Sequence, residues 1–226
     1  MKNEICVVGI DTGTRKSLGY VILNFIVSDG IKEYFKNFKK SYLRDPEKRV
    51  KYFRDLFSKN GRFLSYFVVS YGVLDFSLEK RKESIESILA HVRSIEDSFK
   101  NNSFNSSNSS SMEVIFGVED FLFFNLNGKY RRRYNVKPAS WLTVARMQNA
   151  IGFIEGSLSS YGYQVRLIKP KTWKILMPYC NLLAASLNLD LKKFNKSERS
   201  HIFSAVGIAF YTAFDFVQNQ FGRFRG

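Results

Sequence analysis

The chain has 226 residues, 45% hydrophobic and 16% aromatic, with 35 Lys and Arg against 20 Asp and Glu and a formal net charge of +15. This composition is sufficient for one buried core, so we expect a single domain over 1–226 with insertions near 30–61 and 101–111. The positive charge disfavours a small-molecule enzyme and favours a polyanionic partner, either nucleic acid or an anionic membrane surface. No apolar run approaches the roughly 18 residues of a membrane span and no signal peptide is visible, so we expect a cytoplasmic protein.

The chain opens with a buried strand that is followed at once by an acid. Residues 5–10 are apolar and β-favouring, and Asp11 comes directly after them. A short turn containing Gly13 then leads into a second apolar run, so the two runs should pair as an antiparallel hairpin. An aspartate at such a place is often only a turn former, and it can also be a catalytic carboxylate.

The next hundred residues are expected to supply a strand, a helix and two less regular segments. Basic and aromatic residues alternate over 30–61, which suits either nucleic-acid contact or an amphipathic helix with a solvated lysine face. The run 62–76 is predicted to be a strand, and Ser77 is predicted to cap a helix that continues to about Phe99. The low-complexity stretch 101–111 is predicted to be a flexible loop.

A second apolar strand, 114–118, also ends in an acid, Glu119. If this strand lies beside the first one, Asp11 and Glu119 come within reach of a shared metal ion. An apolar tip at 121–124 and a basic run at 128–134 follow. Together they suit a wedge and a clamp on a nucleic-acid backbone, although the four apolar residues of the tip could also belong to the core.

The last third of the chain is predicted to contain a helix, a strand and a long final helix. The helix over 141–159 has an apolar stripe and a second set of apolar residues off that stripe, with Gly152 and Gly156 permitting close approach, so we expect it to form a dimer contact. A strand over 163–168 precedes three lysines that are candidates for phosphate contact. In the final helix, expected over 197–218, His201 and Ser204 are three residues apart and should project side by side.

Four short stretches in this order resemble the RuvC-type Holliday junction resolvases of the RNase H-like superfamily. They are 9–13 with Gly19-Tyr20, Val118-Glu119, the 141–174 segment, and 201–205 in the last helix. The resemblance implies an α/β fold, namely an RNase H-like mixed five-stranded sheet with helices on both faces. It also implies a metal-dependent homodimer.

Position by position, the resemblance assigns catalytic roles to Asp11, Glu119, His201 and Ser204, and metal binding to the first three. The metal would be Mg²⁺, for which Mn²⁺ can substitute. Ser204 departs from the family, which has its last catalytic aspartate there, and a hydroxyl is a weak Mg²⁺ ligand. Either this copy is inactive or was altered, or Glu198 or Asp215 compensates, Glu198 being the nearer in sequence.

The activity implied is that of a structure-specific endonuclease, a hydrolase of DNA recombination and repair that resolves four-way and other branched junctions at the host nucleoid or replication site. The alternatives are a non-catalytic branched-DNA-binding protein and another nuclease of the same fold. The abundance of Phe, Lys and Asn suggests an AT-rich genome, such as that of a phage, prophage or virus. The residues expected to contact nucleic acid are Arg15, Lys16, Phe123, Lys129, Arg131, Arg132, Arg133, Lys169, Lys171 and Lys174.

Overall fold

A five-stranded mixed sheet forms the centre of the molecule. The computed structural model describes residues 3–13, 16–28, 30–31, 51, 54–57, 64–103, 112–120, 141–174 and 185–221. The strand order is β3-β2-β1-β4-β5, in which β1 is antiparallel to β2 and parallel to β4, and β4 is parallel to β5. The strands are β1 (Asn3–Asp11), β2 (Ser17–Val27), β3 (Leu64–Asp75), β4 (Met112–Glu119) and β5 (Gln164–Ile168).

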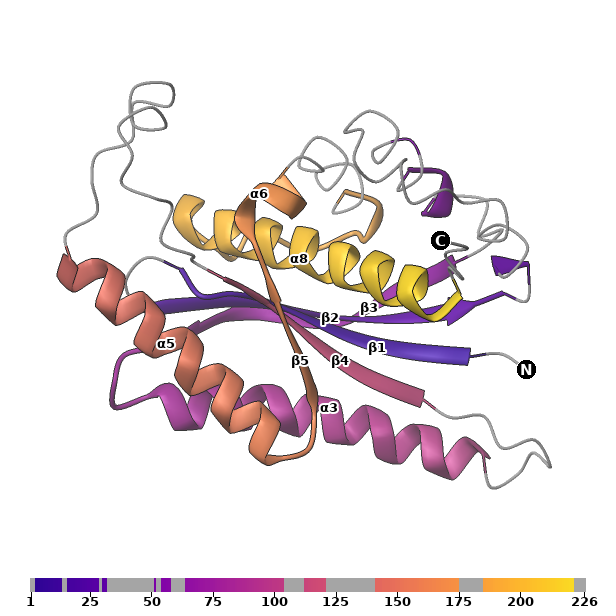
Figure 1. Ribbon diagram of the computed structural model, residues 1–226, viewed down its shortest axis with the longest axis horizontal. Helices are drawn as coiled ribbons and strands as arrows, with labels where there is room; N and C mark the ends of the chain where they lie inside the picture. Colours follow the sequence, from indigo (N-terminus) through magenta and orange to yellow (C-terminus); the bar gives the residue numbers. More distant parts are fainter. Residues whose placement is uncertain are drawn as a thin grey trace.

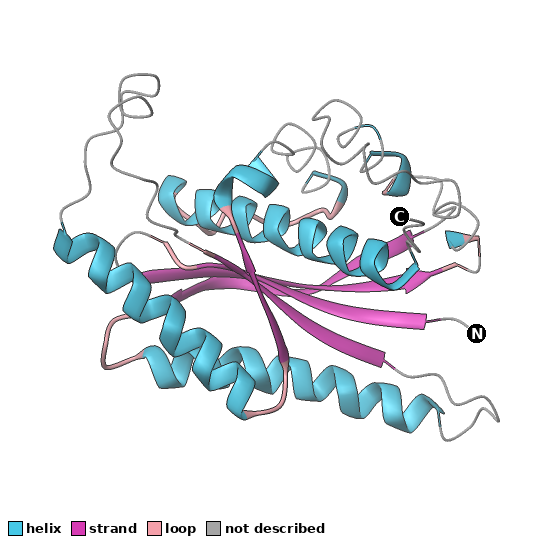
Figure 2. Ribbon diagram, viewed as in Figure 1, coloured by secondary structure: helices cyan, strands magenta, loops and turns pink. Residues whose placement is uncertain are grey.

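Helices cover both faces of this sheet (Figures 1 and 2). The long helix α8 (Lys196–Phe221) lies on one face, and α3 (Arg81–Ser103) and α5 (Trp141–Ser160) lie on the other. A single helical turn, α6 (Pro170–Trp173), follows β5 beside α8. The mixed five-stranded α/β sheet with helices on both faces that the sequence analysis expected is therefore confirmed as the fold class.

The two central strands are apolar because both of their faces are covered. Side chains of β1 and β2 alternate between a cluster under α8 and a cluster under α3 and α5. A strand buried on both faces has no solvated side to carry polar residues, so it is a nearly continuous apolar run. The predicted hairpin is present, and its register places Asp11 opposite Gly19.

Three glycines allow α8 to lie unusually close to the sheet. A Cβ atom on Gly9 of β1 would lie within 2.5 Å of the Ala205 carbonyl oxygen, and one on Gly19 of β2 would lie 2.6 Å from the His201 carbonyl oxygen. A Cβ atom on Gly117 of β4 would overlap the side chain of Thr212. No real Cβ atom tolerates such distances, so these glycines fix the height of α8 above the strands and with it the position of His201.

The predicted insertion at 30–61 contributes to the core wherever the structure describes it. Ile31, Leu56 and Phe57 are 1%, 1% and 3% exposed and belong to the cluster beneath α8. The Phe57 ring packs edge-on against Phe210 of α8, with 5.0 Å between ring centroids. Edge-to-face aromatic pairs stabilise a core by more than the burial of their apolar area alone. The described residues of this segment are therefore part of the hydrophobic core.

Three sequence predictions need correction at the level of secondary structure. The helix predicted to start at Ser77 begins at Arg81, because the Asp75 carboxylate accepts the Ser77 N–H (2.9 Å) and holds a turn there. In α5, the second set of apolar residues that the sequence analysis assigned to a dimer contact includes Phe153, but Phe153 is partly buried against the core beside Phe76. The loop predicted over 101–111 starts later than expected, because α3 continues through Ser103, and its remaining residues lie outside the described part of the chain. The predicted wedge at 121–124 and basic run at 128–134 also lie outside the described residues.

Helix α8 is apolar enough and long enough to cross a membrane by composition alone, over Lys196–Gln220. However, 67% of the most apolar 18-residue stretch of this helix is buried inside the protein. Its apolar character is explained by packing, because the side chains of Ala205, Ala209, Ala213 and Val217 are completely covered.

Candidate active site at the ends of two buried strands

Asp11 and Glu119 lie next to each other at the carboxyl ends of two neighbouring parallel strands. The register of β1 and β4 pairs Ile10 with Val118, so the two acids occupy the next position on each strand. They are only 5% and 4% exposed. Acids are rarely buried to this extent unless they are paired or bind a metal, which singles out this edge of the sheet.

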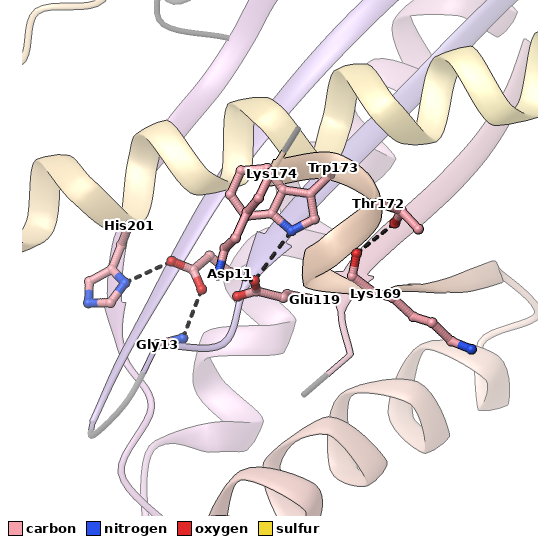
Figure 3. A network of polar contacts seen from close by, with 8 residues as sticks. All are labelled: Asp11, Gly13, Glu119, Lys169, Thr172, Trp173, Lys174 and His201. Atoms are coloured by element: carbon pink, nitrogen blue, oxygen red, sulfur yellow. Dashed lines mark hydrogen bonds and ion pairs between the residues drawn. The ribbon is translucent and has the colours of Figure 1, made fainter. Parts of the chain in front are cut away.

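The Asp11 carboxylate is held on both of its oxygens (Figure 3). Its Oδ1 accepts the Gly13 backbone N–H at 3.2 Å, and its Oδ2 lies 2.8 Å from Nδ1 of His201. Gly13 has a φ of +57°, a left-handed conformation that glycine adopts without strain. The turn after β1 and the first turns of α8 therefore fix the orientation of this carboxylate together.

The Glu119 carboxylate is contacted by two side chains from the short turn after β5 (Figure 3). Trp173 donates its indole N–H to Oε1 at 3.3 Å, and the Lys174 ammonium lies 3.2 Å from the same oxygen. Trp173 is completely buried and packs with Ile168 and Ile208. Because Pro170 begins α6 with a fixed φ, this turn starts at a defined place and delivers both side chains to Glu119.

Burial and crowding shift the proton affinities at this site. The pKa of Glu119 is raised from 4.5 to about 7, first by burial and then by the negative charge of Asp11, and the Lys174 ammonium opposes the change. The pKa of His201 is also raised, chiefly by its hydrogen bond with Asp11. A buried carboxyl group whose pKa is raised by burial and by a neighbouring negative charge is characteristic of a site that holds an additional cation.

The donor set fits a divalent metal, since two of the three predicted metal ligands, Asp11 and Glu119, lie side by side and the third, His201, contacts Asp11. Carboxylate oxygens are the ligands that Mg²⁺ prefers, and Asp11 and Glu119 supply them side by side. Within the described part of the chain, no group of three His, Cys, Asp or Glu side chains surrounds a common point. The hydrogen bond between His201 and Asp11 orients that carboxylate. The Thr12 hydroxyl is buried and has no hydrogen-bond partner among the described residues.

Ser204 lies one helical turn beyond His201 and is partly buried, and neither acid proposed to compensate for it joins the site. The Glu198 carboxylate accepts the Asn195 N–H at 2.9 Å, while the Asn195 side chain accepts the Glu198 N–H at 3.0 Å. This reciprocal capping box at the start of α8 explains why a glutamate stands there. The Asp215 carboxylate pairs with Arg166 at 2.5 Å.

Of the residues expected to contact nucleic acid, only some can be placed. Lys16 and Lys169 are exposed, and the Lys169 side chain points away from the two acids (Figure 3). Lys174 is about half exposed and reaches Glu119. Lys171 lies in α6, but its side chain is outside the described residues. So are all of Arg15, Phe123, Lys129, Arg131, Arg132 and Arg133.

Trp173 is the site residue that sequence reasoning did not assign. The sequence held one signal of a buried side chain there, because Trp173 is a large apolar residue between Lys171 and Lys174, in a segment that was interpreted as a basic contact surface. Its role becomes visible only when β5 is placed beside β4, because Glu119 and Trp173 are 54 residues apart. The three glycines beneath α8 likewise gave no signal of what they pack against.

Two solved structures resemble this chain along nearly its whole length. One is T. thermophilus RuvC in complex with Holliday junction substrate, with a TM-score of 0.47, 15% identity and 96% of each chain covered. The other is Thermus thermophilus RuvC, with a TM-score of 0.45, 17% identity and the same coverage. No family model and no curated protein matches the sequence. Likenesses this distant do not carry an activity from one protein to another, so function has to be argued from the residues of the site.

Proposed function

We propose that this protein is a metal-dependent endonuclease that cuts branched DNA, with four-way junctions as its preferred substrate. The observation that carries the proposal is the pair Asp11 and Glu119, two carboxylates buried side by side at the ends of neighbouring strands, of which Glu119 has its pKa raised to about 7. The net charge of +15 supports a polyanionic substrate. The short stretches that resemble RuvC-type resolvases support the choice of junctions over other DNA.

Each described side chain at the site has a task in phosphodiester hydrolysis. Asp11 and Glu119 would hold Mg²⁺ or Mn²⁺, and the bound metal supplies an activated water and neutralises charge on the leaving oxygen. The hydrogen bond from His201 keeps Asp11 in one orientation, and the Trp173 indole does the same for Glu119. Lys174 places a positive charge beside the pair, where it can contact a phosphate oxygen of the strand being cut.

A two-fold symmetric dimer is the assembly that best matches a four-way junction, because paired incision requires two sites related by symmetry. Helix α5 remains the proposed contact. Gly152 and Gly156 lie on its exposed side, and a Cβ atom at either position would meet none of the described residues within 4 Å. A partner helix could therefore approach closely there. We also propose that the protein comes from a phage, prophage or virus and acts in the cytoplasm, on DNA at the host nucleoid or replication site.

A second function, non-catalytic binding of branched DNA, is favoured by one observation. Ser204 offers no charge where a further acid would strengthen metal binding, and Glu198 and Asp215 are engaged elsewhere. Both functions use the same fold and the same DNA surface. They differ only in whether Asp11 and Glu119 suffice to hold an active metal.

Cleavage assays with matched substrates separate these functions. End-labelled four-way junction, linear duplex of the same sequence and an RNA–DNA hybrid are incubated with Mg²⁺ or Mn²⁺ and wild type, Asp11→Asn or Ser204→Asp. We expect nicks in the junction alone, none with Asp11→Asn, and faster cutting with Ser204→Asp. Cleavage by Ser204→Asp but not by wild type would support the binding protein instead, and preferential cleavage of the hybrid would refute the choice of junctions.

A further inference from the structure

Four exposed cationic side chains lie just before helix α8 and in its first turn, which precedes the turn that carries His201. They are Lys192, Lys193, Lys196 and Arg199, called here the 192–199 patch. Lys192, Lys193 and Lys196 precede the final helix expected over 197–218, and none of the four was among the residues expected to bind nucleic acid. The patch lies at the same end of α8 as the two buried acids, because His201 belongs to the second turn of that helix.

The patch differs from the exposed cations of α3, on the other face of the sheet. On α3 and just before it, lysines are balanced by acids three or four residues away, as in Lys80–Glu83, Lys82–Glu86 and Lys100–Asp97. Within the described residues, none of the four cations of the patch forms an ion pair. The two acids nearest to these cations in the sequence accept hydrogen bonds from the backbone: Glu198 from the Asn195 N–H and Asp190 from the Lys192 N–H.

The position of the patch is unfavourable for folding. The N-terminal end of a helix carries a partial positive charge, so a nearby cation typically opposes helix stability and an acid supports it. Lys196 is the first residue of α8 and Arg199 is the fourth. Cations gathered where the helix disfavours them, and left without acids, indicate a binding partner that carries negative charge.

The backbone beneath the patch is held in one place. The Tyr71 hydroxyl of β3 accepts the Asp190 N–H at 2.8 Å, and Arg199 donates its Nε–H to the Phe194 carbonyl oxygen at 2.8 Å. The Lys193 ammonium lies 5.5 Å and 5.2 Å from the ring centroids of Tyr71 and Phe194. The charges are therefore presented from a fixed support rather than from a free loop.

The distance from Tyr71, which holds the backbone beneath the patch, to Asp11 suits a nucleic-acid strand that contacts both. Tyr71 lies on β3, which is separated from β1 by β2. Asp11 of β1 is level with Gly19 of β2 and Val73 of β3, and Tyr71 is two residues from Val73. With strands about 4.8 Å apart and about 3.4 Å per residue, the Tyr71 and Asp11 backbones are about 12 Å apart. At 3.4 Å of axial rise per nucleotide, this distance spans three to four nucleotides of one strand.

We propose that the 192–199 patch binds the phosphate backbone of one arm of the nucleic-acid substrate, on the β3 side of the two acids. The inference deepens the proposed function and rests on it, because it names the surface that the substrate follows as it leaves the active site. Phosphate groups of DNA satisfy the unpaired cations and the partial positive charge of the helix end together. DNA is favoured over a membrane surface because the patch itself carries charged and polar side chains, without an exposed apolar residue to enter lipid.

The test is the salt dependence of junction binding in EDTA, which prevents cleavage. Wild type is compared with Lys192→Gln/Lys196→Gln/Arg199→Gln and with a control of equal charge change on the opposite face, Lys80→Gln/Lys82→Gln/Lys100→Gln. Each phosphate contact contributes about 0.9 to the slope of log affinity against log salt, so the patch variant should lose up to about 2.7 and the control nothing. The thermal midpoint of the patch variant should stay close to that of wild type, because the removed charges oppose the helix while Arg199 loses its hydrogen bond to Phe194.

Two further variants keep the test decisive. Lys192→Gln alone removes no hydrogen bond among described residues and should flatten the slope by about 0.9, while Arg199→Lys keeps its charge and should retain the wild-type slope. Equal slopes for wild type and all patch variants would overturn this inference and leave the nuclease proposal standing. Failure of wild type to bind the junction would overturn both. Loss of binding to vesicles of 30% phosphatidylserine, with junction binding unchanged, would assign the patch to membranes and also overturn it.

Discussion

The stability of the metal-free protein should fall as the pH rises from about 4.5 to about 7, because of Glu119. Its pKa is about 7 in the folded chain and 4.5 for an ordinary glutamate, so the folded state binds this proton more tightly than the unfolded state. The stabilisation is complete below pH 4.5 and is lost as the pH rises through the folded pKa. His201, whose pKa is raised by Asp11, loses stabilisation in the same direction at higher pH.

The size of the effect follows from the shift. A difference of 7 − 4.5 = 2.5 pH units, at about 1.36 kcal/mol per unit, corresponds to about 3 kcal/mol of unfolding free energy. Glu119 is almost fully buried, so screening by solvent reduces this value little. A change of about 3 kcal/mol is a large part of the total stability of a small domain.

Urea unfolding in EDTA at pH 4.5, 5.5, 6.5, 7.5 and 8.5 measures this change. Glu119→Gln is the matched control, because its amide oxygen can still accept hydrogen bonds from Trp173 and Lys174 but cannot titrate. The wild-type free energy should fall by about 3 kcal/mol more than that of the control, and 10 mM Mg²⁺ should restore more of it at pH 8.5 than at pH 5.5. Parallel curves for the two proteins would refute the claim that Glu119 is forced to bind a proton.

Three further variants test the supports of the site. Gly19→Ala places a Cβ atom 2.6 Å from the His201 carbonyl oxygen and should destabilise the fold by about 1–3 kcal/mol, as measured by urea unfolding; a neutral effect would mean that α8 is not held at that height. Lys174→Met removes the cation that competes with a metal for Glu119, so calorimetry should show Mg²⁺ affinity rising up to about fivefold while junction cleavage slows; weaker Mg²⁺ binding would contradict this competition. Gly152→Arg should convert a dimer to a monomer in analytical ultracentrifugation, and a wild type that is monomeric at micromolar concentration would dismiss the α5 contact.

Most of the fold could be predicted because its signals are local. Apolar runs ending at Asp11 and Glu119 identified two buried strands, and spacing within the last helix put His201 and Ser204 on one side of it, while the resemblance placed His201 near the two acids. The order of the strands came from the resemblance and not from the pattern, since nothing in a single apolar run specifies its neighbour. Helix ends were less reliable, as at Ser77, where a side-chain bond from Asp75 delays the helix by a turn.

The site was harder to predict because its contacts are distant in sequence. His201 is 190 residues from Asp11, and its hydrogen bond to that carboxylate, which orients Asp11, could not be predicted from spacing along the chain. Trp173 approaches Glu119 only through the pairing of β4 with β5. Glu198 looked available as a substitute ligand until its capping bonds with Asn195 were visible.

The most direct test of the metal site is a titration with Mn²⁺ followed by electron paramagnetic resonance, which detects the free ion and needs neither substrate nor turnover. At pH 7.5, wild type should bind Mn²⁺, and Asp11→Asn and Glu119→Gln should each weaken that binding at least about tenfold, the loss of one of two charged ligands. Lys169→Gln, whose side chain points away from the acids, should bind like wild type. Binding that is equal in wild type and both acid variants would contradict a metal centre at Asp11 and Glu119, and with it the proposed nuclease.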